Sequence, residues 1–173
     1  LDTIMIYQSM SGDADSGTSA FTMNGGRLTS SNGHMFHVTN THAVITLSGV
    51  ELVNEDADNI LLSVCSDGWS GASNIAEVNA VGQQLSGDIL VGSDSTLTLR
   101  LTEGSAWTGT VSGEITNAKG SVVSTEVGSV TVSLDAASTW TLTADTWITA
   151  FEGDFANVHT NGYTLYVNGE AVA

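Results

Sequence analysis

Short segments in which apolar and polar residues alternate recur along this chain. Residues 95–110 read STLTLRLTEGSAWTGT and residues 128–143 read GSVTVSLDAASTWTLT, so the two segments align at an offset of 33 without a gap. The alignment superposes Trp107 on Trp140, and a second offset of 33 brings residues 163–165 into the same frame. A period of two predicts β-strands that bury one face.

The same triplet recurs upstream at shorter spacings. Residues 21–25 match residues 45–49 at an offset of 24, and residues 76–78 supply a triplet between them and residue 97. Six triplets result, and their first residues are predicted to point inward: Phe21, Ile45, Ala76, Leu97, Val130 and Tyr163. The third residues are predicted to form a second inward column: Met23, Leu47, Val78, Leu99, Val132 and Leu165. The middle residues are predicted to point outward: Thr22, Thr46, Glu77, Thr98, Thr131 and Thr164.

A unit of 20 to 33 residues cannot bury its apolar face alone, whereas stacked units share one continuous core. We therefore predict an all-β fold, a parallel β-helix (β-solenoid) of about six coils with irregular corner loops. It is one domain over 1–173, with 1–17 as an N-terminal cap or pairing strand and 18–173 as the coils. The alternative is an antiparallel sandwich or jelly roll, supported by Asn-Gly pairs at 24–25, 32–33, 161–162 and 168–169. No segment sustains the 3.6-residue period of a helix.

Charge and composition exclude several classes of function. Three Lys and Arg oppose 19 Asp and Glu, for a net charge of −16, which argues against binding to nucleic acid or to anionic membrane surfaces. Cys65 is the only cysteine, so neither an intrachain disulfide nor a thiolate metal cage is predicted. No apolar run is long enough to insert in a membrane. Leu1 opens no signal-peptide pattern, so we expect a mature or excised fragment of an extracellular protein.

The outward Thr residues and one acidic loop are candidate binding features. A flat rank of Thr is typical of ice-binding surfaces, but Thr is also a common exposed strand residue, and Arg and Glu interrupt the array. Residues 54–59 read NEDADN, and the carboxylates of Glu55, Asp56 and Asp58 are candidate calcium ligands, because calcium prefers several oxygen ligands. The alternative is a solvated acidic turn. No cofactor is expected to be required, and calcium is the one candidate cofactor.

No catalytic constellation emerges from the sequence. The Lys and Arg residues that could accept a proton lie in separate predicted units, at Arg27, Arg100 and Lys119. No Gly-x-Ser-x-Gly motif occurs. His34 and His37 are close in sequence, but a spacing of three on an extended strand predicts that they face opposite sides. We therefore predict that the protein is not an enzyme.

The aromatic residues divide into core and surface candidates. Trp107 and Trp140 align with each other and with Leu85, which favours packing in the core. Trp69 lies in the Gly/Ser-rich loop DGWSG, where an indole is suited to stack on a sugar or on a protein partner; the alternative is that the loop folds back on the molecule. Tyr166 is predicted to face outward on the last unit, and we take Trp69 and Tyr166 as candidate glycan or partner contacts.

Four segments also resemble the repeats of a known class of proteins: residues 20–30 (AFTMNGGRLTS), 42–52 (HAVITLSGVEL), 138–145 (STWTLTAD) and 161–169 (NGYTLYVNG). They resemble bacterial adhesin-like and carbohydrate-binding right-handed parallel β-helix proteins, including autotransporter-passenger-like repeats. The resemblance covers the chain from about residue 18 onward and implies a right-handed β-helix that is secreted or displayed on the bacterial cell surface. It transfers no functional residue. The scarcity of Lys and Arg departs from β-helical pectate lyases.

The expected function is a non-catalytic adhesin-like module that binds polysaccharide or a host or cell surface. The first alternative is a self-assembling subunit of an extracellular filament, because open solenoid ends pair readily. Residues 1–10 (LDTIMIYQSM) read as an apolar strand ahead of the first repeat, and Ile4, Ile6 and Tyr7 are its candidate self-association residues, giving a homo-oligomer through the solenoid ends. The last alternative is a polysaccharide-degrading enzyme.

Overall fold

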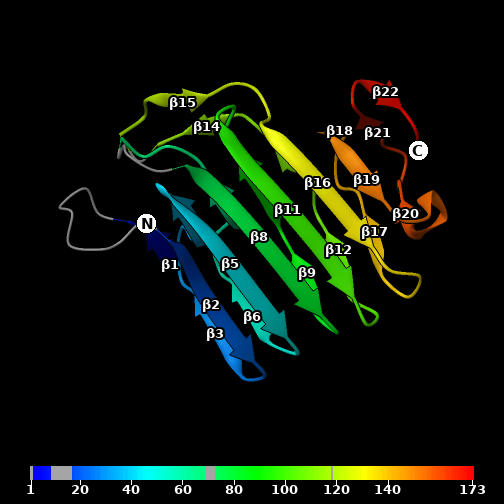
Figure 1. Cartoon of the computed structure of the whole chain (residues 1–173), viewed down its shortest axis with the longest axis horizontal. Helices are drawn as coiled ribbons and strands as arrows, with labels where there is room; N and C mark the ends of the chain where they lie inside the picture. The colour runs from blue at the N-terminus through cyan, green and yellow to red at the C-terminus, as the bar shows by residue number, and fades with distance from the viewer. Residues whose placement is uncertain (1, 9–16, 69–72, 118) are drawn as a thin grey trace.

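A computed structural model of the chain describes residues 2–8, 17–68, 73–117 and 119–173. The protein is all-β, built from parallel sheets, and the described residues hold a single short 3₁₀ helix, η1 (Phe155–Asn157). Figure 1 shows the strands of the longest sheet side by side, ordered along the sequence from the N-terminal end to the C-terminal end of the molecule.

Three sheet regions account for most of the strands. Sheet I has six strands: β2 (Thr18–Asn24), β5 (Thr41–Ser48), β8 (Asn74–Val81), β11 (Ser95–Thr102), β16 (Ser129–Leu134) and β19 (Ala150–Glu152). Sheet II has five: β1 (Asp2–Tyr7), β4 (His34–Thr39), β7 (Ile60–Val64), β10 (Asp88–Val91) and β13 (Val111–Ser112). Sheet III has four: β9 (Gln84–Ser86), β12 (Ala106–Thr108), β17 (Thr139–Thr141) and β20 (Val158–His159).

Smaller pairings complete the architecture. Strands β3 (Arg27–Ser30) and β6 (Glu51–Asn54) pair in parallel, and β14 (Ile115–Thr116) and β15 (Val122–Ser124) form an antiparallel pair. Strands β18 (Thr146–Ile148), β21 (Leu165–Val167) and β22 (Glu170–Ala171) form a three-stranded sheet. The Thr146 hydroxyl accepts a hydrogen bond from the Val111 amide at 3.0 Å, so β18 continues from β13 of sheet II.

Sheet II receives every third strand of the chain, and sheets I and III do so except between β11 and β16 and between β12 and β17, where the pair β14 and β15 is inserted. The path from β5 through β6 and β7 returns to sheet I at β8, which pairs in parallel with β5; the path through β9 and β10 returns to it at β11. The strands of sheet I bury alternate residues, because period-two side chains face the core and solvent in turn. The core therefore runs between the sheets from one end of the molecule to the other.

The predicted inward columns are correct in direction for the first five repeats but partly wrong in register, and Tyr163, the predicted inward residue of the sixth repeat, is instead 42% exposed. Leu97 pairs with Val130 and Leu99 with Val132, as the offset of 33 predicts. Ile45, however, pairs with Val78, whereas Ala76 lies opposite Ala43. A shift of two residues leaves every side chain on the same face, so the alternation alone does not distinguish the two registers.

The sixth repeat is also displaced from its predicted position. The sixth strand of sheet I is β19, in which Phe151 pairs with Val132. The predicted triplet at 163–165 lies elsewhere: Leu165 belongs to β21 and pairs with Thr146. The path between β16 and β19 is short, so the period of 33 does not continue through it.

The antiparallel sandwich is wrong, because all pairings in the three main sheets are parallel. Two of the Asn-Gly pairs that favoured the sandwich lie at different kinds of position in the fold. Asn168 and Gly169 both have positive φ and form the tight turn between the antiparallel strands β21 and β22. The pair at 24–25 instead lies where the chain leaves β2 for β3, with Gly25 at positive φ.

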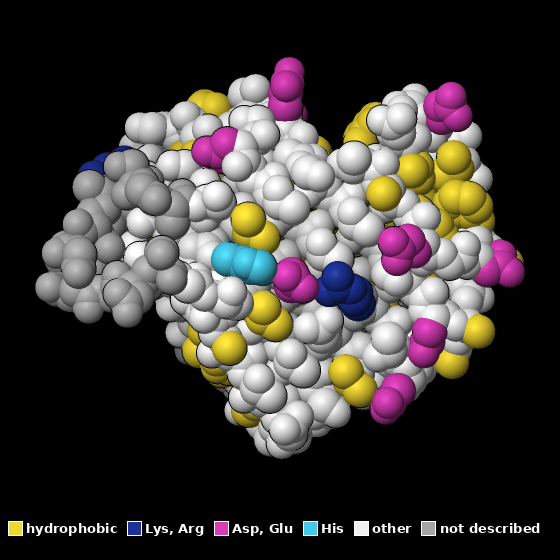
Figure 2. Space-filling view, in the orientation of Figure 1, with side chains coloured by type: hydrophobic (Ala, Val, Ile, Leu, Met, Phe, Trp, Pro, Cys, Tyr) yellow, Lys and Arg dark blue, Asp and Glu magenta, His cyan; other side chains and the backbone are white. Residues whose placement is uncertain are grey.

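The outer face of sheet I carries no continuous rank of Thr. Thr22 pairs with Thr46, but the next members of that row are Asn79, Arg100 and Ser133. Beside this row, Glu77 accepts hydrogen bonds from His42 Nε2 at 2.8 Å and Arg100 at 3.1 Å, and these bonds lower its pKa. Figure 2 shows His, acidic and basic side chains, in cyan, magenta and dark blue, next to one another across the middle of this face.

Candidate functional site

Two aromatic side chains stack on the outer surface near the C-terminal end. Trp147 of β18 pairs with Tyr166 of β21, and their rings lie within 5° of parallel with centroids 4.9 Å apart. Trp147 is 48% exposed, whereas Tyr166 is half-buried. Sequence analysis singled out Tyr166 but missed Trp147. The available signal was the triplet Thr146-Trp147-Ile148, whose outer two members are buried.

Small residues flank this aromatic pair along the same row. Ala171 of β22 lies opposite Tyr166. The Val111 amide donates to the Thr146 hydroxyl, so β13, which ends at Ser112, runs beside β18. We call Trp147 and Tyr166 the aromatic platform; about half of the Trp147 side chain is exposed.

The other tryptophans have different positions. Trp69 lies outside the described residues, so its prediction as a contact residue stays a prediction. Trp107 and Trp140 are fully buried and stack at 4.8 Å, which confirms their assignment to the core. Trp107 also pairs with Leu85, as the sequence alignment predicts.

The acidic loop forms a hydrogen-bonded turn. One carboxylate oxygen of Asp56 accepts the Gly33 amide at 2.7 Å, and the other accepts the Asp58 amide at 3.0 Å. The bond from Gly33, followed by that from Asp58, lowers the pKa of Asp56. Among the described residues, Glu55, Asp56 and Asp58 do not gather as a set of three converging ligands. Calcium binding by this loop stays a prediction.

A different set of side chains gathers on the outer face of sheet II: His34, His37 and Asp2. His34 and His37 do not face opposite sides, and this correction has a local cause. Met35 and Phe36, which lie between them, are both buried, so strand β4 breaks its alternation at its start. The side chains of residues 34–37 therefore point outward, inward, inward and outward in turn, which brings both imidazoles to one surface.

Strand β7 supplies the residue on which the two imidazoles converge. Ser63 pairs with His37 across the sheet, and its Oγ lies 2.6 Å from His37 Nδ1 and 2.7 Å from His34 Nδ1. A hydroxyl has one proton, so Ser63 donates to one ring and accepts from the other. The two imidazoles therefore differ in which nitrogen is protonated.

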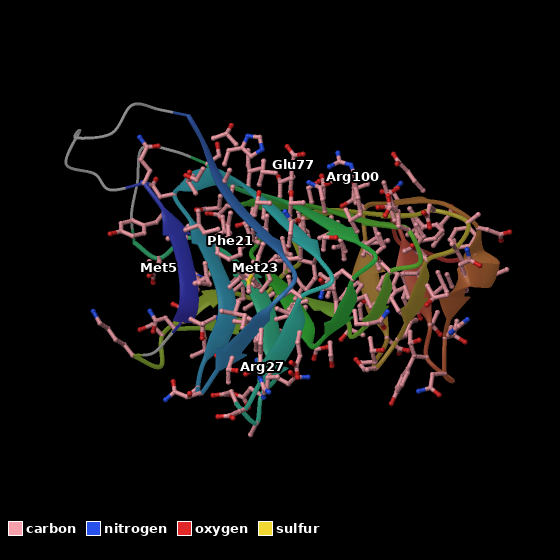
Figure 3. All side chains as sticks on the ribbon, turned by 90° about the horizontal axis from the view of Figure 1, so that it is seen from below. Met5, Phe21, Met23, Arg27, Glu77 and Arg100 are labelled. Atoms are coloured by element: carbon pink, nitrogen blue, oxygen red, sulfur yellow. The ribbon has the colours of Figure 1, made fainter. Side chains whose placement is uncertain are left out.

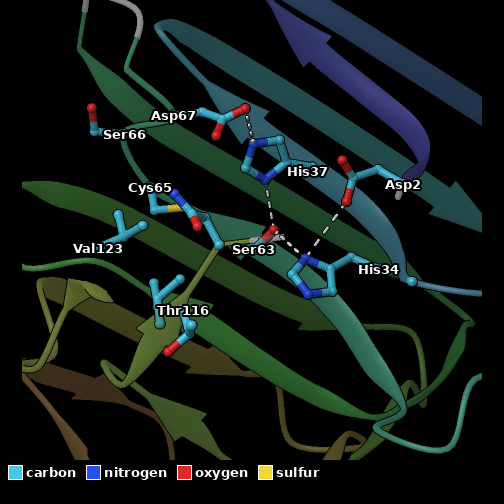
Figure 4. A pocket seen from close by; sticks show the side chains of 12 residues that line it. Asp2, His34, His37, Ser63, Cys65, Ser66, Asp67, Thr116 and Val123 are labelled. Atoms are coloured by element: carbon cyan, nitrogen blue, oxygen red, sulfur yellow. Dashed lines mark hydrogen bonds and ion pairs between the residues drawn. The ribbon is translucent and has the colours of Figure 1, made fainter. Parts of the chain in front are cut away.

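Two carboxylates flank the pair of histidines (Figure 4). Asp2 of β1 pairs with His34, and its Oδ1 lies 3.6 Å from His34 Nδ1. Asp67, which follows β7, places Oδ2 at 3.9 Å from His37 Nε2. Burial lowers the pKa of both histidines, because desolvation of the imidazolium outweighs its attraction to Asp2. Both rings are consequently neutral at pH 7.

These side chains open into a pocket of about 230 Å³. The antiparallel strands β14 and β15 form its opposite wall through Ile115, Thr116 and Val123. Cys65 also lines it, and burial raises the pKa of this thiol to about 12, so the thiol stays protonated at neutral pH. The pocket thus offers imidazole and carboxylate groups rather than a thiolate.

The cluster is suited to binding a cation rather than to nucleophilic catalysis. Ser63, His37 and Asp67 follow one another as in a hydrolase triad. However, Ser63 is fully buried and its hydroxyl is shared by two histidines, which withholds it from a substrate. Two imidazoles and a carboxylate, by contrast, are ligands of transition-metal ions.

The predicted self-association residues belong to β1, at the edge of sheet II. Ile4 and Ile6 pack against the core, whereas Tyr7 is 46% exposed. Strand β1 pairs in parallel with β4 of the same chain. Self-association through these residues stays a prediction.

Within the described ranges, no helix has the length and apolar character needed to cross a membrane. No protein-family model matches the chain, and neither the curated proteins nor the solved structures contain a significant match.

Proposed function

We propose that the chain is a right-handed parallel β-helix that acts as a non-catalytic, glycan-binding module at the bacterial cell surface. The order of the sheets supports the β-helix, because a chain that winds through three sheets in turn returns to each at an interval of three strands, and only the inserted pair β14 and β15 interrupts this order. Sheet I has six strands, in keeping with about six coils, although its sixth strand is β19 and not the predicted triplet at 163–165. The scarcity of Lys and Arg and the richness in Ser and Thr are in keeping with an extracellular setting.

The aromatic platform is the observation that carries glycan binding. Sugar rings present apolar C–H faces, which pack well against an exposed indole, while their hydroxyls remain hydrated. The parallel stacking with Tyr166 restrains the Trp147 ring, so less conformational entropy is lost on binding.

Replacing Trp147 by Ala tests this proposal. We expect the wild-type protein to bind at least one polysaccharide on a glycan array, and Trp147→Ala to weaken that binding by about ten-fold or more, which corresponds to about 1.4 kcal/mol. Trp147→Phe should retain part of the affinity, since it keeps an aromatic face. The measurement is titration calorimetry with the polysaccharide identified on the array.

Phe155→Ala is the matched control. Phe155 is also an exposed aromatic residue, at 41%, but it stacks on Phe151 outside the platform. Equal losses in Trp147→Ala and Phe155→Ala, or no bound glycan at all, would contradict the proposal. Repeating the array with a chelator tests the calcium prediction separately.

A second candidate function, end-to-end assembly, is favoured by the edge strands at the N-terminal end. In the described part of the chain, no strand pairs with the outer edges of β1, β2 or β3. Phe21 and Met23 of β2 are half-buried and lie between the sheets at this end, whereas Glu77 and Arg100 lie on the outer face (Figure 3). Unpaired edges with apolar neighbours are suited to accept another chain.

We expect sedimentation velocity to detect concentration-dependent assembly if this edge accepts a second copy. Met23→Lys should then shift the protein toward monomer, because it places a charge at the end of the core. Thr22→Lys adds the same charge to the outer face of the same strand and is expected to have a smaller effect. A wild-type protein that stays monomeric at high concentration rules the assembly out.

A further inference from the structure

We propose that Asp2, His34 and His37 form a binding site for one divalent transition-metal ion, with Zn²⁺ as its best-suited occupant. The proposal does not depend on glycan binding, because the site lies on sheet II at β1 and β4, whereas the platform lies on β18 and β21. It rests on the convergence of three ligands, two imidazoles and one carboxylate, from two strands.

The ligand atoms are already near metal-binding separations. One atom from each of Asp2, His34 and His37 lies within 4.8 Å of the others, and these are the only three described acidic, His or Cys residues so gathered. Zinc holds nitrogen and oxygen ligands at about 2.0–2.2 Å, which places neighbouring ligands of a tetrahedron about 3.4 Å apart. The 3.6 Å between His34 Nδ1 and Asp2 Oδ1 is close to that value.

Ser63 holds the two imidazoles toward a common centre. Its Oγ contacts both Nδ1 atoms, so these nitrogens point at one place even without a cation. An ion that binds there takes over the nitrogen lone pairs, and the hydroxyl then supplies a fourth ligand or turns aside. The imidazoles pay little reorientation cost, because the sheet positions them in advance.

Asp67 provides the outer contact that metal-binding histidines commonly have. Its carboxylate faces His37 Nε2, the nitrogen not used toward the ion, at 3.9 Å. A carboxylate there fixes the ring with Nε2 protonated and leaves Nδ1 free as a ligand.

The ligand chemistry selects the class of metal. Calcium and magnesium prefer sites made of oxygen atoms, whereas imidazole suits zinc and its neighbours in the first transition row. Cys65 is not part of the cluster, so the ligand set contains no soft thiolate. The pocket beside the cluster gives the ion a route from solvent, and the net charge of −16 attracts cations toward the protein.

The test is zinc titration of chelator-treated, untagged protein by calorimetry in the presence of excess calcium and magnesium, which occupy weak carboxylate sites. We expect one ion per chain, a visible Co²⁺ spectrum with imidazole ligation, and a higher melting temperature on addition of zinc. Asp2→Asn and His34→Gln should each weaken zinc binding by at least ten-fold and abolish the stabilisation.

Two variants control for adventitious binding. Asp58→Asn removes a carboxylate from the acidic loop, and His159→Gln removes the exposed histidine of β20. Both should bind zinc as the wild type does. Far-ultraviolet circular dichroism establishes that Asp2→Asn is folded; if its affinity equals that of Asp58→Asn, or if the wild type takes up no stoichiometric zinc, the proposal is overturned.

Discussion

Trp140→Ala is expected to lower the free energy of unfolding by about 3–5 kcal/mol, the range for removing a large buried aromatic side chain. Trp140 is fully buried and stacks on Trp107 with centroids 4.8 Å apart, so its loss leaves a cavity beside a second indole. Its Nε1 also donates to the Gly109 carbonyl at 2.9 Å, and that buried acceptor is left without its partner. Urea denaturation followed by circular dichroism measures the loss.

Two further variants separate the contributions to this effect. Trp140→Phe keeps an aromatic ring but removes the donor, so its loss should be smaller than that of Trp140→Ala. Trp147→Ala removes a half-exposed indole from the surface and should change stability much less. If Trp147→Ala and Trp140→Ala destabilise the protein equally, the assignment of Trp140 to the core is wrong.

Gly109→Ala has the second large expected effect, a loss of about 3 kcal/mol from overpacking and backbone strain combined. Gly109 has a φ of +155°, and a Cβ there would collide with the Gly87 carbonyl oxygen and lie 2.8 Å from Trp107 Nε1. That oxygen accepts the Trp107 indole proton at 2.9 Å. The substitution therefore disturbs a backbone contact and a buried hydrogen bond together.

Gly162→Ala is the matched control for the backbone. Gly162 also has positive φ, at +88°, but nothing lies within 4 Å of the place its Cβ would occupy. Its substitution should lower the free energy of unfolding by only about 1–2 kcal/mol, the cost of holding a residue with a Cβ at positive φ. Thermal melts of both variants measure the difference, and a Gly109→Ala variant as stable as Gly162→Ala contradicts the close approach.

The parts of the fold that sequence analysis anticipated are those encoded locally. Leu97 and Leu99 were placed opposite Val130 and Val132 because two identical patterns align without a gap. Trp107 and Trp140 were matched because their type recurs at the same place in both patterns. In each instance, the residues adjacent in the sequence are sufficient to predict the pairing.

The candidate sites were anticipated less well. The cluster of Asp2, His34 and His37 is not predicted by regular strand alternation, because the buried pair Met35-Phe36 reverses the expected side of His34. A second buried apolar pair, Leu61-Leu62 of β7, precedes Ser63. Two such pairs in neighbouring strands are the sequence pattern that indicates a break in the alternation, and therefore this cluster. Nothing near the histidines in sequence points to Asp2, which belongs to another strand.

By itself, the sequence determined that this chain forms β-strands, which residues of the first five repeats face the core, and that Trp107 and Trp140 repeat, because side-chain alternation and residue type are local properties. Only the tertiary structure decided that Ile45 meets Val78, that β19 ends sheet I, and that Trp147 meets Tyr166. The physical reason is that alternation is unchanged by a shift of two residues. The length and path of each connection, together with core packing, choose among the shifts, and they bring Asp2, His34 and Ser63 to one place.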